Sequence, residues 1–393
     1  MKNISFLIGS GFSVPAGYPT TTRLNERLGK IDASEISIHT SGNARFLNGE
    51  ADPNIPWMRT EQRKFVQEFL RFYRDIELGP EGNFHYETFY DYYRSPLDEE
   101  KYPETLAKFL DDFRRKHEIE TDNHYLLLDF HHTFNQLIAQ LLTKPLERVH
   151  LCKPYGPNYC AFLQLAEELA KTHRVHIHTL NHDLYMEHLA HSDGIQGKMD
   201  DGFEELGSTF FGELYDKYER YLVRLSRFTG RFEQQFCLYK LHGSIDQYWF
   251  QDDDELYLIK LKRGVSPLKI FKERKKDGVL EYVNRPTDYF PDFLSGTTSK
   301  TERYQGHYYR NILDSFKRNL RSSKALITIG YGFNDLGINQ FVQDSFLTDD
   351  SRTLFVVDVM KPDKPFLTHN NVLFIGGGVS EMNTEFILGH VNP

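Results

Sequence analysis

The opening of the chain, a buried strand followed by a glycine turn and a helix, constrains the fold more than any other stretch. An apolar run over residues 4–8 breaks into the turn Gly9-Ser10-Gly11-Phe12-Ser13, and a helical pattern follows over 22–28. This order builds an anion site at the edge of a parallel sheet, because glycines let the backbone approach a phosphate and N–H groups at the helix start face it. Val14 stands where the fingerprint G-x-G-x-x-G has its third glycine, which disfavours a hydride-transfer enzyme and leaves a plain structural turn open.

Further apolar runs alternate with helical patterns, which predicts an α/β protein with a Rossmann-like, doubly wound parallel sheet. The predicted strands cover residues 175–180, 236–241, 325–329, 353–358 and 371–375. The predicted helices cover 61–73, 83–93, 103–117, 125–142, 157–171, 212–228, 308–320 and 337–346. We therefore expect residues 1–30 and 151–393 to form the sheet domain, with a large helical insertion at 31–150 and irregular insertions near 190–235 and 247–305.

Composition narrows the class of protein. The 393 residues are 39% hydrophobic, enough for a sizeable core, and the net charge of −9 argues against direct nucleic-acid binding. Three cysteines without C-x-x-C spacing indicate neither a zinc ribbon nor a disulfide framework, and they fit a reducing compartment. There is no leader-like segment and no apolar run of about 18 residues, so we expect a soluble, cytoplasmic protein that does not enter a membrane.

Polar or glycine residues follow five of the predicted strands, where open α/β sheets bind their ligands. These segments are Gly9-Ser10-Gly11, Thr179-Leu180-Asn181-His182-Asp183, His242-Gly243-Ser244, Gly330-Tyr331-Gly332-Phe333-Asn334-Asp335 and Asp358. Each alone is compatible with a structural turn, and Asn334 or Asp335 could simply cap the following helix. Five such segments in order along the sheet favour a binding site.

In this order the segments resemble the motifs of the sirtuin family, and most closely the bacterial sirtuin-like branch found in antiphage defence proteins. The matching residues are Gly9, Gly11, Ser13, Gly17 and Pro19, then Thr179, Asn181 and Asp183, then His242-Gly243-Ser244, then Gly330-Tyr331-Gly332-Phe333 and Asp335. The resemblance covers the sheet segments and not the insertion at 31–150. It implies a Rossmann-like fold and NAD as the substrate.

The resemblance also implies roles for individual residues. Asn181 matches the asparagine that holds the nicotinamide ribose, Asp183 the aspartate that contacts the carboxamide, and His242 the catalytic histidine. A histidine suits the last role, because its pKa lies near neutrality and it can take a proton from a hydroxyl or water. The remaining matches assign the pyrophosphate to Gly9, Ser10, Gly11 and Ser13, and the adenosine half to Gly330, Gly332, Asn334 and Asp358. His85 and Glu87 could line the nicotinamide end, although an aromatic packing helix is the simpler interpretation of 83–93.

Departures from the sirtuin deacylases favour water as the acceptor. Those enzymes carry four zinc cysteines after the His-Gly motif, whereas this chain has no cysteine after Cys237. We therefore expect no metal and an NAD glycohydrolase that releases nicotinamide and ADP-ribose, acting as an NAD-depleting effector of antiphage, abortive-infection defence. Two alternatives stay open: a non-catalytic sensor of NAD or an ADP-ribose derivative, and a zinc-free protein deacylase or ADP-ribosyltransferase.

Restraint of such an enzyme is expected from assembly. Many of the 31 phenylalanines and 23 tyrosines fall in predicted helices, and aromatic-rich helices bury broad faces that oligomers also use. The chain leaves little room after its last predicted strand for a sensor domain. We expect a homo-oligomer, and the resemblance implies a hexameric, DNA-translocating ATPase of the HerA type as a partner.

Overall fold

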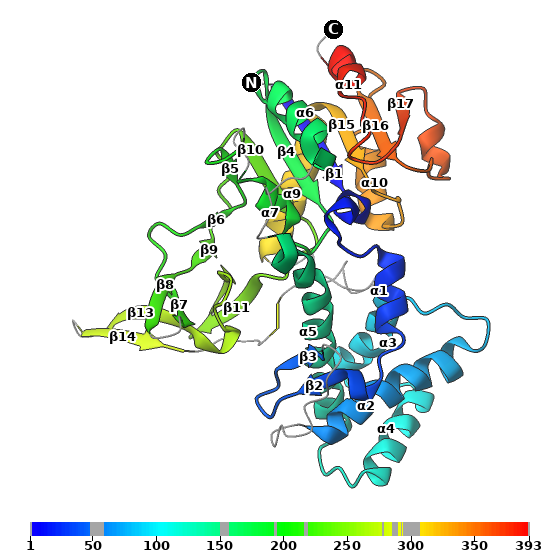
Figure 1. The fold of residues 1–393 in the computed structure, drawn as a ribbon, viewed down its shortest axis with the longest axis vertical. Helices are drawn as coiled ribbons and strands as arrows, with labels where there is room; N and C mark the ends of the chain where they lie inside the picture. The colour runs from blue at the N-terminus through cyan, green and yellow to red at the C-terminus, as the bar shows by residue number, and fades with distance from the viewer. Residues whose placement is uncertain are drawn as a thin grey trace.

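The computed structural model describes residues 2–47, 59–149, 157–191, 195–215, 219–276, 279–284, 290–291, 293 and 307–391. Figure 1 shows a sheet covered by helices near the two termini, a helical unit at the other end, and a pair of small sheets beside them. The fold is mixed α/β, as the sequence predicts.

A parallel sheet of seven strands contains the first and the last strand of the described chain, in the order β17-β16-β15-β1-β4-β10-β5. All neighbouring strands run parallel. The strands are β1 (Lys2–Ile8), β4 (His173–Thr179), β5 (Met199–Asp200), β10 (Phe236–Lys240), β15 (Ser323–Ile329), β16 (Thr353–Asp358) and β17 (Val372–Gly376). Without the short β5, the strands numbered along the chain stand in the order 3-2-1-4-5-6, which is that of dinucleotide-binding sheets, and the predicted Rossmann-like fold is confirmed.

Helices cover both faces of this sheet, as a doubly wound fold requires. α6 (Cys160–Ala170) and α11 (Thr384–Val391) pack on one face, and α9 (His307–Ser322) and α10 (Leu336–Ser345) pack on the other. Strand β16 shows why: Phe355 and Val357 belong to the first core, whereas Leu354 and Val356 belong to the second. Because both faces are buried, the strands read as solid apolar runs, which made them predictable.

A helical unit occupies much of the predicted insertion. Its elements are β2 (Ile36–Ile38), β3 (Ala44–Phe46), α2 (Thr60–Phe72) with a π-helical continuation (Tyr73–Leu78), α3 (Tyr86–Glu99), α4 (Glu104–Lys116) and α5 (Asn123–Val149). α1 (Thr21–Leu28) leads into it from the sheet. The hairpin β2–β3 is absent from the elements that the sequence predicts. None of the helices within the described ranges is both long and apolar enough to cross a membrane.

The described segments between β5 and α9, apart from β10, correct the sequence-based prediction. They form two antiparallel sheets of four strands, ordered β11-β12-β9-β6 and β14-β13-β7-β8, so the helix predicted over 212–228 is wrong and the described parts of the "irregular" insertions are regular. The strands are β6 (Phe203–Glu204), β7 (Phe210–Tyr215), β8 (Arg220–Arg224), β9 (Ser226–Phe228), β11 (Gln247–Asp252), β12 (Glu255–Lys260), β13 (Ile270–Lys276) and β14 (Val279–Val283). The reason is that aromatic and β-branched residues in half-buried strands take their conformation from cross-strand partners, here Phe211 opposite Arg224.

Candidate active site

A cavity of about 320 Å³ lies where the carboxyl ends of β1, β4, β10 and β15 meet. The chain passes from β1 to β4 and β10 on one side of the sheet and then returns to β15 on the other side of β1. The helix that precedes β4 (α6) and the helix that follows β15 (α10) accordingly cover opposite faces of the sheet. Open α/β sheets bind ligands at such a switch point. The volume falls within the usual range of small-molecule sites, roughly 300–1,000 Å³.

Eight of the eleven predicted site residues line this cavity. They are Gly9, Ser10, Asn181, Asp183, His242, Gly330, Gly332 and Asn334. Gly11, Ser13 and Asp358 do not line it. Asp358 ends β16, two strands from β1, where its carboxylate accepts a 3.3 Å hydrogen bond from the Met360 N–H. The structure therefore brings residues predicted for the nicotinamide end, the pyrophosphate and the adenosine half into one cavity, and it leaves Asp358 outside.

The glycines of the first turn pack against a glycine of the turn after β15. A Cβ atom at Gly9 would lie 2.5 Å from the Gly330 carbonyl oxygen, and one at Gly11 would lie 2.8 Å from the Gly330 Cα. Gly330 itself has a φ of 58°, in the left-handed region that favours glycine. Backbone contact between β1 and β15 thus explains all three glycines before any ligand is considered.

Hydrogen bonds within this turn correct part of its predicted role. The Gly11 N–H donates to the Gly330 carbonyl at 3.0 Å, the Phe12 N–H to Gly9 at 3.1 Å, and the Ser13 N–H to Ser10 at 3.2 Å. These three N–H groups are engaged by the protein and do not face the cavity as free donors. The Gly9 N–H is engaged as well, by the Ile329 carbonyl at 3.1 Å. Any polar contact of this turn with a phosphate therefore falls to Ser10, which lines the cavity.

Asn181 ties the end of β4 to the turn after β1. Its side-chain Nδ2 donates to the Gly9 carbonyl at 2.9 Å and to the Ser13 Oγ at 3.1 Å. Its backbone N–H donates to the Thr179 Oγ1 at 3.1 Å. Because these contacts use the amide nitrogen, the side chain presents its carbonyl oxygen as the acceptor for a ligand hydroxyl.

Asp183 is buried at the floor of the cavity. Its Oδ1 accepts a 2.9 Å hydrogen bond from the Tyr185 N–H, and its carbonyl oxygen accepts one from the Lys240 ammonium. Burial raises the pKa of the Asp183 carboxyl, and the nearby charge of Lys240 opposes that rise. A carboxyl held in this way is fixed in direction and suits recognition of an amide.

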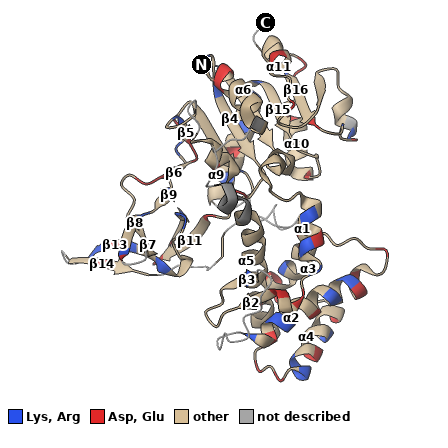
Figure 2. Ribbon diagram, viewed as in Figure 1, with Lys and Arg blue, Asp and Glu red and all other residues tan. Residues whose placement is uncertain are grey.

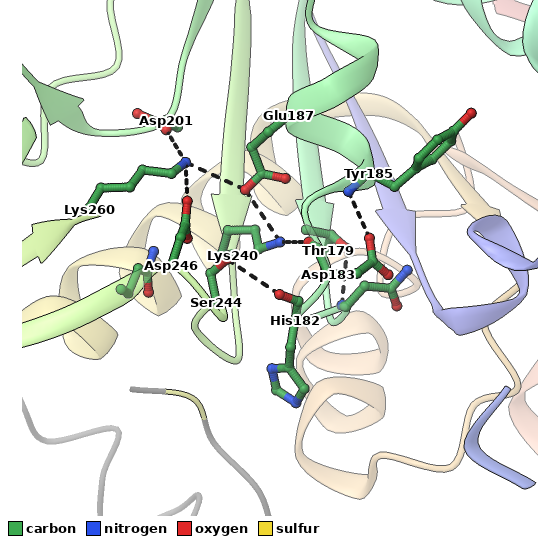
Figure 3. Close-up of polar contacts among 12 residues, drawn as sticks. Thr179, His182, Asp183, Tyr185, Glu187, Asp201, Lys240, Ser244, Asp246 and Lys260 are labelled. Carbon is green, nitrogen blue, oxygen red and sulfur yellow. Dashed lines mark hydrogen bonds and ion pairs between the residues drawn. The ribbon is translucent and has the colours of Figure 1, made fainter. Parts of the chain in front are cut away.

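A charge network lies beneath the floor, made up of Glu187, Asp201, Lys240, Asp246 and Lys260 (Figure 3). The Lys260 ammonium lies 2.6 Å from Asp201, 3.5 Å from Glu187 and 3.5 Å from Asp246. The Lys240 ammonium lies 3.4 Å from the same Glu187 carboxylate. Since Lys260 ends β12 and Lys240 ends β10, the network joins an antiparallel sheet to the strand that precedes His242.

His242 follows β10 and is buried at the cavity wall. Its Nε2 lies 3.3 Å from the Oδ2 of Asp335, which begins α10. The ring of His182 is near, with a centroid distance of 6.2 Å, and it packs against Phe293 at 4.8 Å. A histidine beside a carboxylate is the arrangement of a general base.

The helical unit closes the other side of the cavity with Tyr86 and Glu87 from α3 and Leu142 from α5. Glu87 thus lies where the sequence places a lining residue, whereas His85 does not line the cavity. Pro19, Thr21 and Leu24 complete this wall. The sequence did not indicate Leu142 and Leu24 as lining residues, because an apolar residue on an amphipathic helix is normally interpreted as part of the core.

Two further features, the contact between His242 and Asp335 and the buried Lys240, were not predicted from the sequence. The contact of Asp335 with His242 joins the ends of two distant strands, and the sequence offered Asp335 as a motif residue or a helix cap, with no role beside His242. Lys240 did carry a signal, since a lysine ending the buried run Phe236–Lys240 must find a buried partner. Among the described residues, no group of three or more His, Cys, Asp or Glu side chains is arranged to hold a metal ion.

Solved structures of Sir2 proteins are similar to this chain over most of its length. A Sir2 homologue mutant bound to 2′-O-acetyl ADP-ribose is 13% identical, with a TM-score of 0.36, covering 99% of this chain and 92% of its own. A Sir2 homologue–NAD complex is 12% identical, with a TM-score of 0.36 and coverages of 99% and 89%. A Sir2–p53 peptide–NAD+ complex is 10% identical, with a TM-score of 0.35 and coverages of 98% and 92%. No protein-family model and no curated protein matches the chain. At these identities and TM-scores, we base the proposed function on the residues of the cavity.

Proposed function

We propose that this protein is an NAD glycohydrolase, which cleaves the bond between nicotinamide and ribose to give nicotinamide and ADP-ribose. The observation that carries the proposal is that Asn181, Asp183 and His242, from the ends of two different strands, line one cavity beside the glycine turn of β1. Their motifs are those by which the chain resembles sirtuins, and the strand order is that of dinucleotide-binding sheets.

The reaction needs little covalent help from the protein. The bond from the ribose C1′ to the pyridinium nitrogen breaks, and its electron pair makes nicotinamide a neutral leaving group. The ribose becomes oxocarbenium-like, as in glycoside hydrolysis, and a water oxygen bonds to C1′. The proton of that water passes to His242 and then to solvent, so the balance is NAD+ and water to nicotinamide, ADP-ribose and a proton.

The other residues bind and orient. The Asn181 side-chain oxygen accepts from a ribose hydroxyl, since its nitrogen is occupied by Gly9 and Ser13. The Asp183 carboxyl contacts the nicotinamide carboxamide, and Ser10 lies at the pyrophosphate. The helical unit excludes bulk water from the reacting carbon through Tyr86 and Leu142.

In the cell, we propose that this activity depletes NAD in the cytoplasm as an abortive-infection response to phage. Self-assembly, a HerA-type ATPase, or both would restrain it. The phenylalanine rings of the helical unit do not argue for an interface, because Phe65, Phe69 and Phe130 are buried inside a single chain. The support for a partner is the motif resemblance alone.

Nicotinamide release from NAD by the purified chain tests the reaction, with His242→Ala and Asn181→Ala beside it. General acid–base catalysis contributes about 10²–10⁴-fold, so His242→Ala should lower kcat by at least about 100-fold. His369→Ala, at an exposed histidine outside the cavity, is the matched control and should retain activity. Activity that survives both cavity substitutions would refute the site. NAD binding without release, in buffer and in cell extract, would favour the sensor.

A further inference from the structure

The side chain of Asp335 divides its two oxygens between two tasks. Oδ1 accepts a 3.0 Å hydrogen bond from the Ile338 N–H and so caps the first turn of α10. Oδ2 lies 3.3 Å from the His242 Nε2, and the two side chains are only 15% and 5% exposed. An N-cap needs one acceptor, and Asn or Ser would supply it as well as Asp does. The cap alone therefore does not explain a carboxylate at this position.

The turn that carries Asp335 is held by the helix it begins. Phe333 is fully buried with a φ of 54°, a strained conformation for a residue with a side chain. The Asn339 Nδ2 donates to the Phe333 carbonyl at 2.8 Å, and the Tyr331 hydroxyl donates to the Asn339 Oδ1 at 2.9 Å. These contacts fix the direction of the turn, and with it the place of the second carboxylate oxygen.

We propose that Asp335 is a positioning residue for His242, in that its carboxylate orients the imidazole and favours the protonated ring formed when His242 takes a proton. The proposal rests on the proposed function, because His242 is the base of that reaction. A neighbouring negative charge stabilises the imidazolium and makes the histidine a stronger base. Asp335 acts through His242 and needs no contact with the reacting carbon.

The remaining titratable side chains of the cavity do not replace this carboxylate. They are Tyr86 and Glu87 from α3, His182 and Asp183 after β4, and Tyr331 after β15. His182 is a second imidazole, whose ring centre lies 6.2 Å from that of His242. Asp183 is engaged by the Tyr185 N–H. The lysine nearest to His242 in sequence, Lys240, points its ammonium at Glu187.

Asp335→Asn separates positioning from capping, since the amide keeps the cap and loses the charge. We expect kcat to fall by at least about 10-fold, with KM for NAD changed by less than about 2-fold, because a base has been weakened and binding has not. The acid limb of the pH profile should move to lower pH, since His242 then loses its proton more readily. Asp335→Ser, which also keeps a capping acceptor and removes the charge, should show the same changes in kcat and in the pH profile. Asp32→Asn, the same change at a capping aspartate of the helical unit, is the matched control. Wild-type kinetics in Asp335→Asn would overturn the proposal.

A second readout does not depend on hydrolysis. The His242 ring can be titrated by NMR in histidine-labelled protein, its signal being the one lost in His242→Ala. We expect its pKa to fall by about one unit in Asp335→Asn. Equal titration in both proteins would overturn the positioning role even if NAD is hydrolysed. A lowered pKa in a chain that releases no nicotinamide would support the positioning contact and refute the proposed reaction.

Discussion

Two regions of this molecule are packed in opposite ways, one with aromatic rings and the other with charged side chains. In the helical unit, an aromatic core of Phe65, Phe69, Phe89, Tyr93, Phe130 and Phe134 is fully buried. Some neighbouring rings meet edge to face, as Phe69 and Phe130 do at 4.9 Å and 80°, and others stack, as Phe65 and Phe69 do. Beneath the candidate site, the packing is made instead by ion pairs of the charge network, which consists of Glu187, Asp201, Lys240, Asp246 and Lys260. In the helical unit, acidic and basic residues lie along the α2 and α4 ribbons instead (Figure 2).

The difference lies in what each region demands of its members. Apolar burial is non-directional and its free energy grows with the buried area. Replacing one ring by a smaller apolar side chain therefore loses only part of the stabilisation. A buried ion depends on its partners, because desolvation opposes it. Burial by itself lowers the pKa of Lys260, but Asp201, Asp246 and Glu187 outweigh burial and hold that pKa well above the ordinary value. The charge network therefore depends on each of its charged residues, whereas the aromatic core tolerates substitution by other apolar residues.

The largest expected effect comes from removing the central cation of the network. Lys260→Met leaves three carboxylates facing one another, and breaking a buried pair in this way costs about 3–5 kcal/mol in the free energy of unfolding. Urea unfolding at pH 7 measures it. At pH 5 the loss should be smaller, because burial raises the pKa of Asp246 and an uncompensated carboxyl takes up a proton more readily.

Lys262→Met is the matched control, since Lys262 lies two residues further on and pairs with Glu205 where the side chains are 41% and 48% exposed. An exposed pair contributes about 0–1 kcal/mol. If Lys260→Met were no worse than Lys262→Met at pH 7, the charges beneath the site would not be the constraint that the comparison makes them.

A buried histidine of β4 extends the comparison to pH. His176 lies between the Tyr239 hydroxyl and the Asn3 Oδ1, each at 3.2 Å, and burial lowers its pKa from 6.5 to about 4. A depressed pKa gives stability that is present above pH 6.5 and lost as the pH falls toward 4. The shift corresponds to about 3 kcal/mol.

Replacement by glutamine keeps a neutral polar group and removes the titration. The free energy of unfolding of His176→Gln should therefore fall less than that of the wild type between pH 7 and pH 4, by about 2–3 kcal/mol. Urea midpoints across that range measure it, with His369→Gln at an exposed position as the control. Parallel curves for wild type and His176→Gln would contradict the assignment.

The sequence predicts the elements whose conformation follows from their own residues, and it does not predict features that depend on contacts with distant segments. β16 was predictable, because its residues 354–357 are apolar on both faces of a doubly covered strand. β7 and β8 were not, since a half-buried strand depends on its partners for its conformation. In the site, Asn181, Asp183 and His242 were visible as polar residues after apolar runs. The His242–Asp335 contact and the role of Lys260 were not, because each joins elements that meet only in the folded chain.

A smaller effect is expected in the aromatic core. Phe69→Leu removes part of a buried ring from contacts with Phe65, Phe89 and Phe130. The cost should be about 1–2 kcal/mol, because neighbouring side chains relax into part of the space. The same loss should appear at pH 7 and pH 5, since no charge is involved. A loss that changed by more than about 1 kcal/mol between the two pH values would break the distinction between the regions.

The smallest effect should come from the charges of the helical unit itself. Arg115 and Asp112 pair across one turn of α4, with side chains 76% and 55% exposed. Arg115→Ala should change the free energy of unfolding by less than about 0.5 kcal/mol, and added salt should reduce even that, because water already solvates both groups. Arg115→Ala and Lys260→Met each remove one positive charge. Lys260 faces three carboxylates whereas Arg115 faces one, and the Lys260 side chain is 16% exposed against 76% for Arg115. If both variants cost the same in urea unfolding, charge alone would govern their stability. If they differ as expected, the constraint beneath the site comes from holding ions that are largely withdrawn from water.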